Sequence, residues 1–465
     1  IFKIGVGPSS SHTLGPWKAA LAFLELLPDV HEVATLKVQL YGSLSKTGVG
    51  HGTDIAVMLG LEGFDPETIE TADIPFHISR IRSQEQLNVG GEHAGAKIGF
   101  KPAQDIVFED RVRSFHPNGL SFEARLQSGR KIRQTFYSTG GGFIVREGTA
   151  SQLVTGPTLP YPIDCADDLL RCARGAGRSI AEIVRANELR LYQPAELEAK
   201  LDRYLAVFSS VVHKGCTAPE TNLPGGLNVR RRARKLVATL LKAPAADNFH
   251  DFDLQLRGLT NDFATVTTAV SCFALAVHEE NAALGRVITS PTNGAAGVIP
   301  AVLFYYRYFC PETSPELERN FLMVAGEIGS IFKKNATISA AEGGCQAEIG
   351  VSSAMAAAAL TEVLGGTVEQ ALMAAEIAME HHLGMTCDPI GGLVQIPCIE
   401  RNAMGAMKAI TAAKLALQSD PDDAVVELDV VIQTMLDTAR AMHADYKETA
   451  EGGLAMRVSV AMAAC

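Results

Sequence analysis

The chain has 465 residues and a formal charge of −11, from 41 lysines and arginines against 52 aspartates and glutamates. This acidic balance argues against general binding to nucleic acids or anionic membranes, because both need a basic surface. The composition, 47% hydrophobic and 20% charged, is typical of a globular protein, and the length predicts about two or three domains. Nine cysteines in no regular framework favour a reducing cytoplasm over a secreted, disulfide-linked fold. The longest apolar runs are too short or too rich in Thr and Ala to span a bilayer.

A first glycine-rich loop, GVGPSSSHTLGP, occupies residues 5–16 and precedes a helix predicted over residues 17–27. Serines before a helix, here Ser10 and Ser11, can cap its free N–H groups, and the same place can bind an anion. The residues leave both interpretations open, and they put His12 beside the serines.

A second glycine-rich loop follows a strand predicted over residues 36–40. It reads YGSLSKTGVGHGTD, covers residues 41–54 and carries Lys46 and His51 before a short helix. A lone histidine is more often structural than catalytic, so this loop indicates a catalytic role only in combination with the other motifs.

Short alternating strands are predicted between residues 104 and 139. The segments 105–115, 120–126 and 131–139 are separated by the turns HPNG and QSGR, which predicts a three-strand meander. A proline-rich connector at residues 155–162 predicts the main domain boundary.

Beyond the connector, nearly every segment has helical periodicity, with Ala-, Gly- and Met-rich faces that permit close packing. The predicted helices cover residues 179–191, 194–212, 230–242, 262–280, 297–307, 316–333, 351–364, 368–383, 402–417 and 424–445. We therefore expect an α+β fold, with an α/β domain containing a small antiparallel sheet at residues 1–157. A linker at 158–178 and an all-α catalytic domain at 179–465 complete the expected organisation.

The stretch from residue 343 to residue 398 is the most distinctive part of the chain. It opens with GGCQAEIG and closes with CDPIGGLVQIPC, so Cys345, Cys387 and Cys398 lie among small and apolar residues. Thiolates in such surroundings suit a [4Fe–4S] cluster, and three of them leave one iron free as a Lewis acid. Gaps of 42 and 11 residues are unlike the tight ferredoxin spacing, so three ordinary buried cysteines remain the alternative.

A third loop, SPTNGAAG, precedes a predicted helix. Ser290, Thr292, Asn293 and Gly294 combine three side-chain hydrogen-bonders with the free N–H groups of a helix start. This combination suits a carboxylate, although a simple helix cap explains it equally from the residues alone.

Six strings of the sequence resemble the signature blocks of the bacterial iron–sulfur L-serine dehydratases and occur in the same order as in that family. They are GPSSSHTLGP, GSLSKTGVGHGTD, LPGGLNVRRRA, SPTNGAAG, AEGGCQAEIG and CDPIGGLVQIPCIERNA, and they extend from near residue 5 to residue 403. The resemblance implies the family's β and α parts fused in one chain. It also implies a cluster on Cys345, Cys387 and Cys398, and conversion of L-serine to pyruvate and ammonia without pyridoxal phosphate.

Within this resemblance, His51 is the favoured base for the α-proton of serine, because neutral imidazole is available near pH 7. His12 would assist or orient, and Lys46 would be a second base or a partner of the substrate carboxylate. The residues expected to bind the substrate are Ser10, Ser11, Ser290, Thr292, Asn293 and Gly294.

The chain ends in an apolar segment beyond Gly452 and Gly453, with Cys465 as its last residue. An exposed apolar end would be unusual, so we expect the segment to pack inward. Cys465 would then reach the site and ligate the fourth iron as a plug that serine displaces; a frayed terminus is the alternative.

Two other functions stay open. One is a pyridoxal-phosphate dehydratase with Lys46 as the Schiff base and residues 140–142 as the phosphate cup. The other is a non-catalytic iron–sulfur sensor with four permanent protein ligands.

The basic run at residues 230–235 predicts a solvated helix face rather than a nucleic-acid site. We expect L-serine as the partner molecule, no nucleic-acid or membrane partner, a homodimer and a cytoplasmic location. The cysteines assigned to structure are Cys165, Cys172, Cys216, Cys272 and Cys310.

Overall fold

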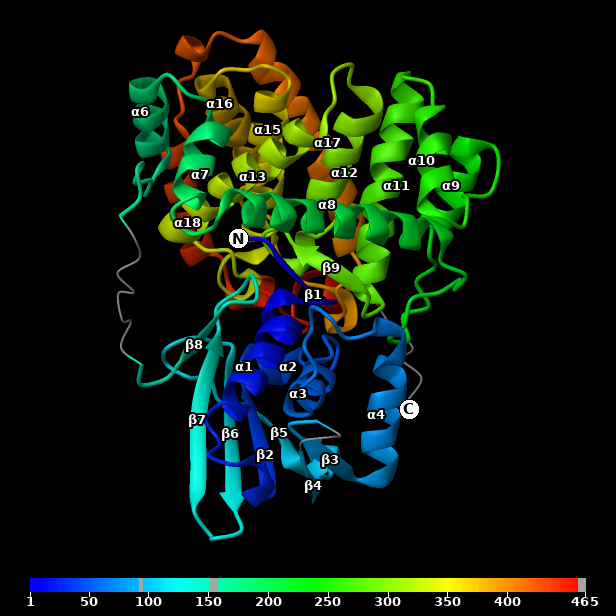
Figure 1. The fold of residues 1–465 in the computed structure, drawn as a ribbon, viewed down its shortest axis with the longest axis vertical. Helices are drawn as coiled ribbons and strands as arrows, with labels where there is room; N and C mark the ends of the chain where they lie inside the picture. The colour runs from blue at the N-terminus through cyan, green and yellow to red at the C-terminus, as the bar shows by residue number, and fades with distance from the viewer. Residues whose placement is uncertain (92–94, 150–157, 459–465) are drawn as a thin grey trace.

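The computed structural model describes residues 1–91, 95–149 and 158–458, which form two parts lying one above the other (Figure 1). The N-terminal part is built around a five-stranded sheet, and the larger C-terminal part is almost entirely helical. The predicted α+β class is therefore confirmed.

The main sheet has the strand order β5-β2-β6-β7-β8. Its strands are β2 (Val33–Tyr41), β5 (Ile106–Glu109), β6 (Gly119–Leu126), β7 (Lys131–Ser138) and β8 (Ile144–Arg146). The hairpin of β6 and β7 is confirmed. The predicted meander is wrong at its first strand, because β5 pairs in parallel with β2 and not with β6. The nine-residue β2 is longer than the four-residue β5 and buries more apolar side chains, so it is the better partner for β6.

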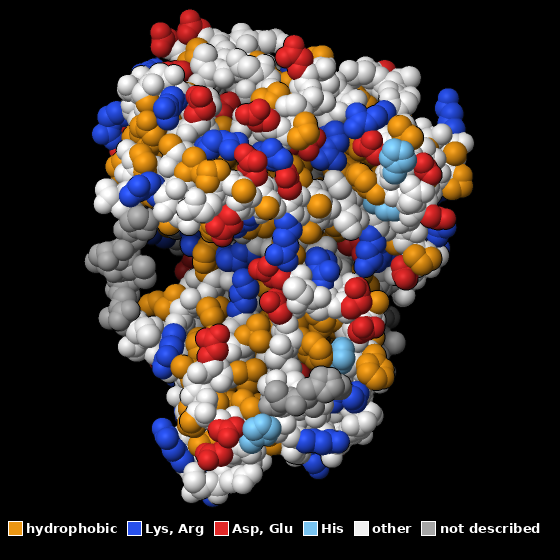
Figure 2. Space-filling view, in the orientation of Figure 1, with side chains coloured by type: hydrophobic (Ala, Val, Ile, Leu, Met, Phe, Trp, Pro, Cys, Tyr) orange, Lys and Arg blue, Asp and Glu red, His pale blue; other side chains and the backbone are white. Residues whose placement is uncertain are grey.

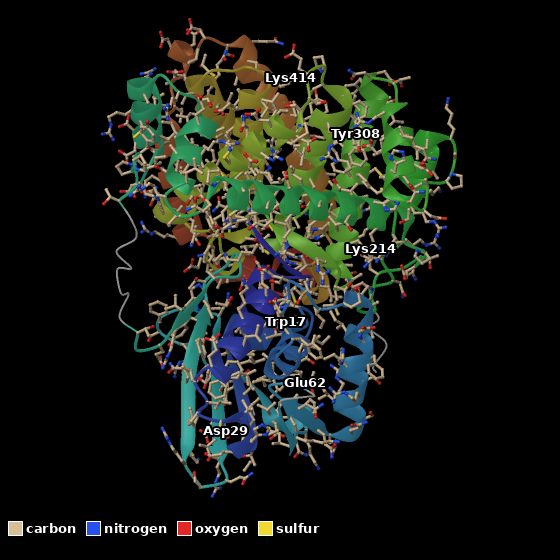
Figure 3. The ribbon with its side chains drawn as sticks, viewed as in Figure 1. Trp17, Asp29, Glu62, Lys214, Tyr308 and Lys414 are labelled. Atoms are coloured by element: carbon tan, nitrogen blue, oxygen red, sulfur yellow. The ribbon has the colours of Figure 1, made fainter. Side chains whose placement is uncertain are left out.

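Helix α1 (Gly15–Leu24) covers one face of this sheet, and α3 (Thr53–Leu61) packs against α1. Phe23 of α1 stacks on Phe122 of β6, with ring centroids 5.1 Å apart. Trp17, labelled in the N-terminal part in Figure 3, is buried and donates its Nε1–H to the carbonyl of Phe64 at 2.7 Å. The remaining elements of this part are α2 (Ser43–Lys46), α4 (Ile74–Gln84), the hairpin of β3 (Gln86–Val89) and β4 (Ala96–Gly99), and α5 (Pro102–Asp105).

The first strand of the chain joins the two parts, a pairing that the sequence did not predict. β1 (Lys3–Val6) runs antiparallel to β9 (Arg286–Thr289), at the boundary seen in Figure 1. Ile4 of β1 is buried in the helical core, whereas Val6 is buried in the core of the N-terminal part. One short strand thus contributes to both cores.

The helical part is built around the alanine-rich α15 (Ile349–Val363), which packs against α13 (Pro315–Asn335), α16 (Val368–Glu380) and α17 (Cys398–Gln418). Its small side chains let these helices approach closely, as expected from the composition. The other helices are α6 (Ala166–Ala176), α7 (Ile180–Glu188), α8 (Pro194–Thr217), α9 (Ala233–Leu241), α10 (Phe249–Arg257), α11 (Phe263–Ala282), α12 (Val298–Phe309), α14 (Ala340–Gly343) and α18 (Leu428–Ala441). Helix α6 lies inside the expected linker, and α10 was not predicted. In the described ranges, we find no helix with both the length and the apolarity to cross a bilayer.

Charged side chains of both signs are intermingled on the face seen in Figure 2. Two arginines of the basic run make ion pairs. Arg231 binds Glu280 at 2.6 Å, and Arg232 binds Glu400 at 2.7 Å. Lys214, labelled near the boundary in Figure 3, also pairs with Glu280 at 3.4 Å and so lies close to the same buried carboxylate.

Candidate active site

The predicted loops meet where the two parts face each other. Gly50, in the second loop of the N-terminal part, lies against Gly392 of the loop between Cys387 and Cys398. A Cβ atom at Gly50 would stand 2.9 Å from the carbonyl oxygen of Gly392, so only glycine permits this approach. The histidine-bearing and cysteine-bearing motifs are therefore neighbours in space.

Hydrogen bonds tie the two N-terminal loops together. The Thr13 hydroxyl donates to the His51 carbonyl at 2.7 Å, and the Thr53 hydroxyl donates to the His12 carbonyl at 2.6 Å. The imidazole rings of His12 and His51 consequently lie with their centroids 4.6 Å apart, and both side chains are buried.

Both ring nitrogens of His12 are engaged. Its Nδ1 lies 3.2 Å from a carboxylate oxygen of Glu448 and 2.8 Å from the Ser11 hydroxyl. A carboxylate can only accept, so Nδ1 carries a proton. Its Nε2 lies 3.0 Å from the Ser43 hydroxyl, which accepts the Nε2–H when the ring is protonated and donates to Nε2 when the ring is neutral. His12 therefore organises its surroundings and has no free lone pair.

His51 differs in this respect. Its Nδ1–H donates to the Thr47 carbonyl at 2.8 Å, and no described group forms a hydrogen bond with its Nε2. Burial lowers the pKa of His51 to about 4, with a further lowering by His12. The ring is thus neutral near pH 7, with an available lone pair on Nε2.

Glu448 comes from the C-terminal segment and was not predicted. It is buried, and one oxygen contacts His12 and Ser11, while Oε2 has no hydrogen-bond partner among the described residues. Burial would raise the pKa of Glu448, but the charge of His12 lowers it below its ordinary value. The carboxylate is therefore held ionised inside the site.

Backbone hydrogen bonds hold this segment against the cysteine loop. The N–H of Cys387 donates to the Tyr446 carbonyl at 2.7 Å, and the N–H of Thr449 donates to the Cys387 carbonyl at 3.2 Å. Leu454 donates its N–H to the Asp388 carboxylate at 2.7 Å. Of the described residues at this end, Leu454, Met456 and Val458 are exposed, so the expectation of inward packing is not met for them. Cys465 lies outside the described residues.

The three predicted cysteines come together. Cys345 lies in a short 3₁₀ turn, Cys387 in a loop and Cys398 at the start of α17. All three are buried, and ligand atoms of Cys345, Cys387 and Glu348 lie within 4.8 Å of one another. The hydrogen bond from the Cys387 thiol lowers the pKa of Cys345 to about 7. Cys398 is outside this group of ligand atoms, but Arg401, in the same first turn of α17, donates to the Thr386 carbonyl and so holds this turn beside Cys387. Burial, and then the charge of Cys345, raise the pKa of Cys398.

Two charged residues adjoin the thiols and were also missed. Burial raises the pKa of Glu348 well above its ordinary value, and the nearby Cys345 raises it further. Burial would lower the pKa of Arg401, but Cys345 and Cys398 raise it instead. Arg401 donates to the Thr386 carbonyl at 2.6 Å, which fixes it beside the cysteine loop. Glu348 follows Cys345 by three residues, which was the available signal for it.

The third loop also reaches this centre. A Cβ atom at Gly294 would stand 2.5 Å from the Glu348 carboxylate, so this glycine leaves room for it. The Thr292 hydroxyl and the Asn293 Oδ1 are buried without a hydrogen-bond partner in the described structure. Ser290, in contrast, donates its hydroxyl to the Ile288 carbonyl at 3.1 Å. Orphaned buried polar atoms of this kind are typical of a site that binds a polar ligand.

Lys46 lies apart from the buried group. Its side chain is 48% exposed, and its ammonium forms an ion pair with Glu451 at 2.8 Å. Ser10 is buried in the first loop, next to Ser11. The structure thus brings His12, His51 and Ser11 together and leaves Lys46 at the surface.

The residues present fit an iron–sulfur cluster. Three buried cysteines come from separate segments, two of them with Sγ atoms within 4.8 Å of each other, and an arginine interacts with their charge. The histidine pair adds groups that can accept and donate a proton, so the arrangement is typical of an enzyme active site.

Comparisons with known proteins place this architecture. The family model described as "Serine dehydratase beta chain" matches residues 1–149, and "Serine dehydratase alpha chain" matches residues 175–455. An L-serine dehydratase of Streptomyces coelicolor is 45% identical, and L-serine dehydratase 2 of Escherichia coli is 44% identical, each over 98% of both chains. An L-serine dehydratase of Helicobacter pylori is 40% identical over 98% of this chain and 97% of that protein. The chain belongs to the serine dehydratase family.

Proposed function

We propose that this protein converts L-serine to pyruvate and ammonia, with a [4Fe–4S] cluster held by Cys345, Cys387 and Cys398. The observation that carries the proposal is the grouping of the Cys345 and Cys387 thiols, with the buried Cys398 on the adjoining helix, near a histidine whose Nε2 lone pair is free. The names of the relatives, L-serine dehydratases over nearly their full length, support the substrate.

His51 is the group that removes the α-proton in this proposal. Its Nδ1–H is committed to the Thr47 carbonyl, so only Nε2 can accept the proton. His12 holds Glu448 and Ser43 in place, and the ionised Glu448 stabilises the positive charge that develops on His51.

The third loop orients the substrate. The orphaned Thr292 hydroxyl can donate to the serine carboxylate, and the orphaned Asn293 Oδ1 can accept from the ammonium group. Ser10, Ser11, Ser290 and Gly294 complete the proposed substrate surroundings. Lys46 has no role here, because its ammonium is exposed and paired with Glu451. The same exposure disfavours a pyridoxal-phosphate Schiff base at this lysine.

The cluster, when bound, supplies a Lewis acid that helps the β-hydroxyl to leave. Loss of the α-proton and of the hydroxyl removes one water and leaves aminoacrylate. This tautomerises to the imine, and addition of water then gives pyruvate and ammonia.

The test is iron and sulfide analysis with a pyruvate assay, both on protein purified without oxygen. Iron, sulfide and serine-dependent pyruvate together support the proposal. A pyridoxal absorbance would support the alternative dehydratase, and a cluster without turnover would support the sensor. Either result would reject the proposed function.

We also propose that Cys465 occupies the fourth iron until serine displaces it. The hydrogen bonds of residues 446–454 to the cysteine loop support this role, since they hold Leu454, eleven residues before Cys465, beside that loop. We expect Cys465→Ala to change the apparent KM for serine and the visible spectrum of the cluster. An unchanged KM and spectrum would reject the plug.

A cytoplasmic location and a homodimer belong to the same proposal. The eight described cysteines are all free thiols, which supports a reducing compartment. Analytical ultracentrifugation tests the dimer, and a monomer at all concentrations would reject it.

A further inference from the structure

The two faces of the main sheet differ in the side chains that they carry. Helix α1 packs on the face that carries Phe122. Figure 1 shows this helix beside the strands of the sheet. Side chains alternate along a strand, so the opposite face carries Gln39 of β2, Ser121 of β6 and Thr135 of β7. This face is polar, and the loop of residues 110–118 runs along it.

Three arginines gather on this polar face. Arg111 and Arg113 come from the loop and Arg133 from β7, and they line a pocket of about 430 Å³. The other lining residues are Gln134, Thr135 and Glu147. The pocket therefore presents three guanidinium groups and one carboxylate, in a chain whose overall charge is −11.

The single carboxylate is already committed. Glu147 accepts two hydrogen bonds from Arg113, at 3.0 and 3.2 Å, and another from the Tyr137 hydroxyl. Within the described part of the chain, Arg111 and Arg133 form no ion pair with a carboxylate. Arg133 donates only to the neutral Gln39 oxygen, at 2.8 Å. Two positive charges therefore remain without a counter-charge.

Aromatic packing fixes the orientation of the loop arginines. The guanidinium carbons of Arg111 and Arg113 lie 5.1 and 5.3 Å from the centroid of the Tyr41 ring. Stacked guanidinium groups keep their N–H donors free at the edge and lose little freedom on binding a ligand. Planar donors of this kind bind pairs of anionic oxygens.

We propose that Arg111, Arg113 and Arg133 form a binding site for a small anion with several oxygens, a phosphate ester or a dicarboxylate. The site is separate from the reaction centre.

The backbone connects this pocket to the reaction loop. The carbonyl of Arg111 accepts the N–H of Gly42 at 3.1 Å, and the carbonyl of Pro117, in the same loop, accepts the N–H of Ser43 at 3.2 Å. The Ser43 hydroxyl in turn lies 3.0 Å from His12 Nε2. An anion that draws the loop toward Arg133 therefore alters the position of Ser43 and, through it, of His12.

Calorimetric titration of the oxygen-free, full-length protein with sodium phosphate and, separately, sodium succinate tests the site. We expect a saturable isotherm with at least one anion, and the one that binds identifies the ligand class. Arg111→Gln and Arg133→Gln should each weaken binding about tenfold, because each removes a charge-assisted hydrogen bond. Arg130→Gln, in the turn between β6 and β7, carries the same charge change outside the pocket and should bind like the wild type.

No saturable isotherm with either anion, or equal weakening in all three variants, would overturn the site. The coupling is tested by serine kinetics with the bound anion present. We expect KM or kcat to change in the wild type and not in Arg111→Gln; no change in the wild type would overturn the coupling. Because calorimetry needs no turnover, this outcome is independent of the proposed reaction.

Discussion

His12 and His51 are buried side by side, yet their hydrogen bonds assign them different tasks. A carboxylate and a hydroxyl engage both nitrogens of His12, whereas a single carbonyl engages one nitrogen of His51. The motifs predicted both histidines, and the preference for His51 as base is supported by its free Nε2. That preference stays a prediction until activity is measured.

Replacing the base should stop the reaction and leave the metal site alone. We expect His51→Ala to lower kcat by at least about 100-fold, the usual size of a lost general base, with normal iron and sulfide content. His381→Ala is the matched control, because the imidazole is exposed and, among the described residues, contacts only groups of its own helix. Near-normal turnover of His51→Ala would remove it from the mechanism.

The burial of His51 also sets the pH dependence. An ordinary imidazole is half protonated at about 6.5, whereas the lowered pKa of about 4 keeps His51 neutral as the pH falls through 6.5. We therefore expect kcat/KM for serine to hold its value from pH 7.5 to 6 and to decline only at lower pH. A half-maximal loss at pH 6.5 would show that His51 titrates as an ordinary histidine.

Local sequence patterns could not predict that the C-terminal segment lies in the site. Glu448 meets Ser11 across 437 residues of sequence, and no motif surrounds it. The main helices were predictable because their apolar periodicity is strong. β1 and β9 were not predicted, since strands of four residues carry too little pattern. β5 was predicted as a strand, but its partner was not, because β2 is distant in sequence.

Two glutamates of this segment form a matched pair for experiment. Glu448 is buried beside His12, whereas Glu451 is exposed and pairs with Lys46. We expect Glu448→Gln to lower kcat about tenfold or more, because the charge that stabilises the protonated histidines is lost. Glu451→Gln should keep wild-type kinetics. Equal kinetics in the two variants would contradict a role for the buried carboxylate.

At the scale of the whole molecule, the reaction centre exists only where the two parts meet. The histidines come from one part, the cysteines from the other, and Glu448 from the segment that returns between them. The signature strings predicted the histidines and the cysteines but not Glu448. They also did not predict which side chains would touch, because contact depends on how the parts pack.

The strand β1 should therefore be disproportionately important for stability. Ile4 is 2% exposed in the helical core, so Ile4→Ala should lower the free energy of unfolding by about 2–5 kcal/mol. Ile132→Ala on β7 removes the same atoms from a half-buried position and should cost less. Urea denaturation at constant pH compares the two, and equal losses would contradict the bridging role of β1.

The two parts are fastened at both ends of the chain, by the pairing of β1 with β9 and by the contacts of Glu448 with His12 and of Glu451 with Lys46. Neither of these contacts is made by the residues between 149 and 158. A polypeptide of this design severed there would keep both fastenings as a non-covalent heterodimer. The fusion of the two parts in one chain thus fixes their ratio at one to one. Their association itself is determined by the contacts between the folded parts.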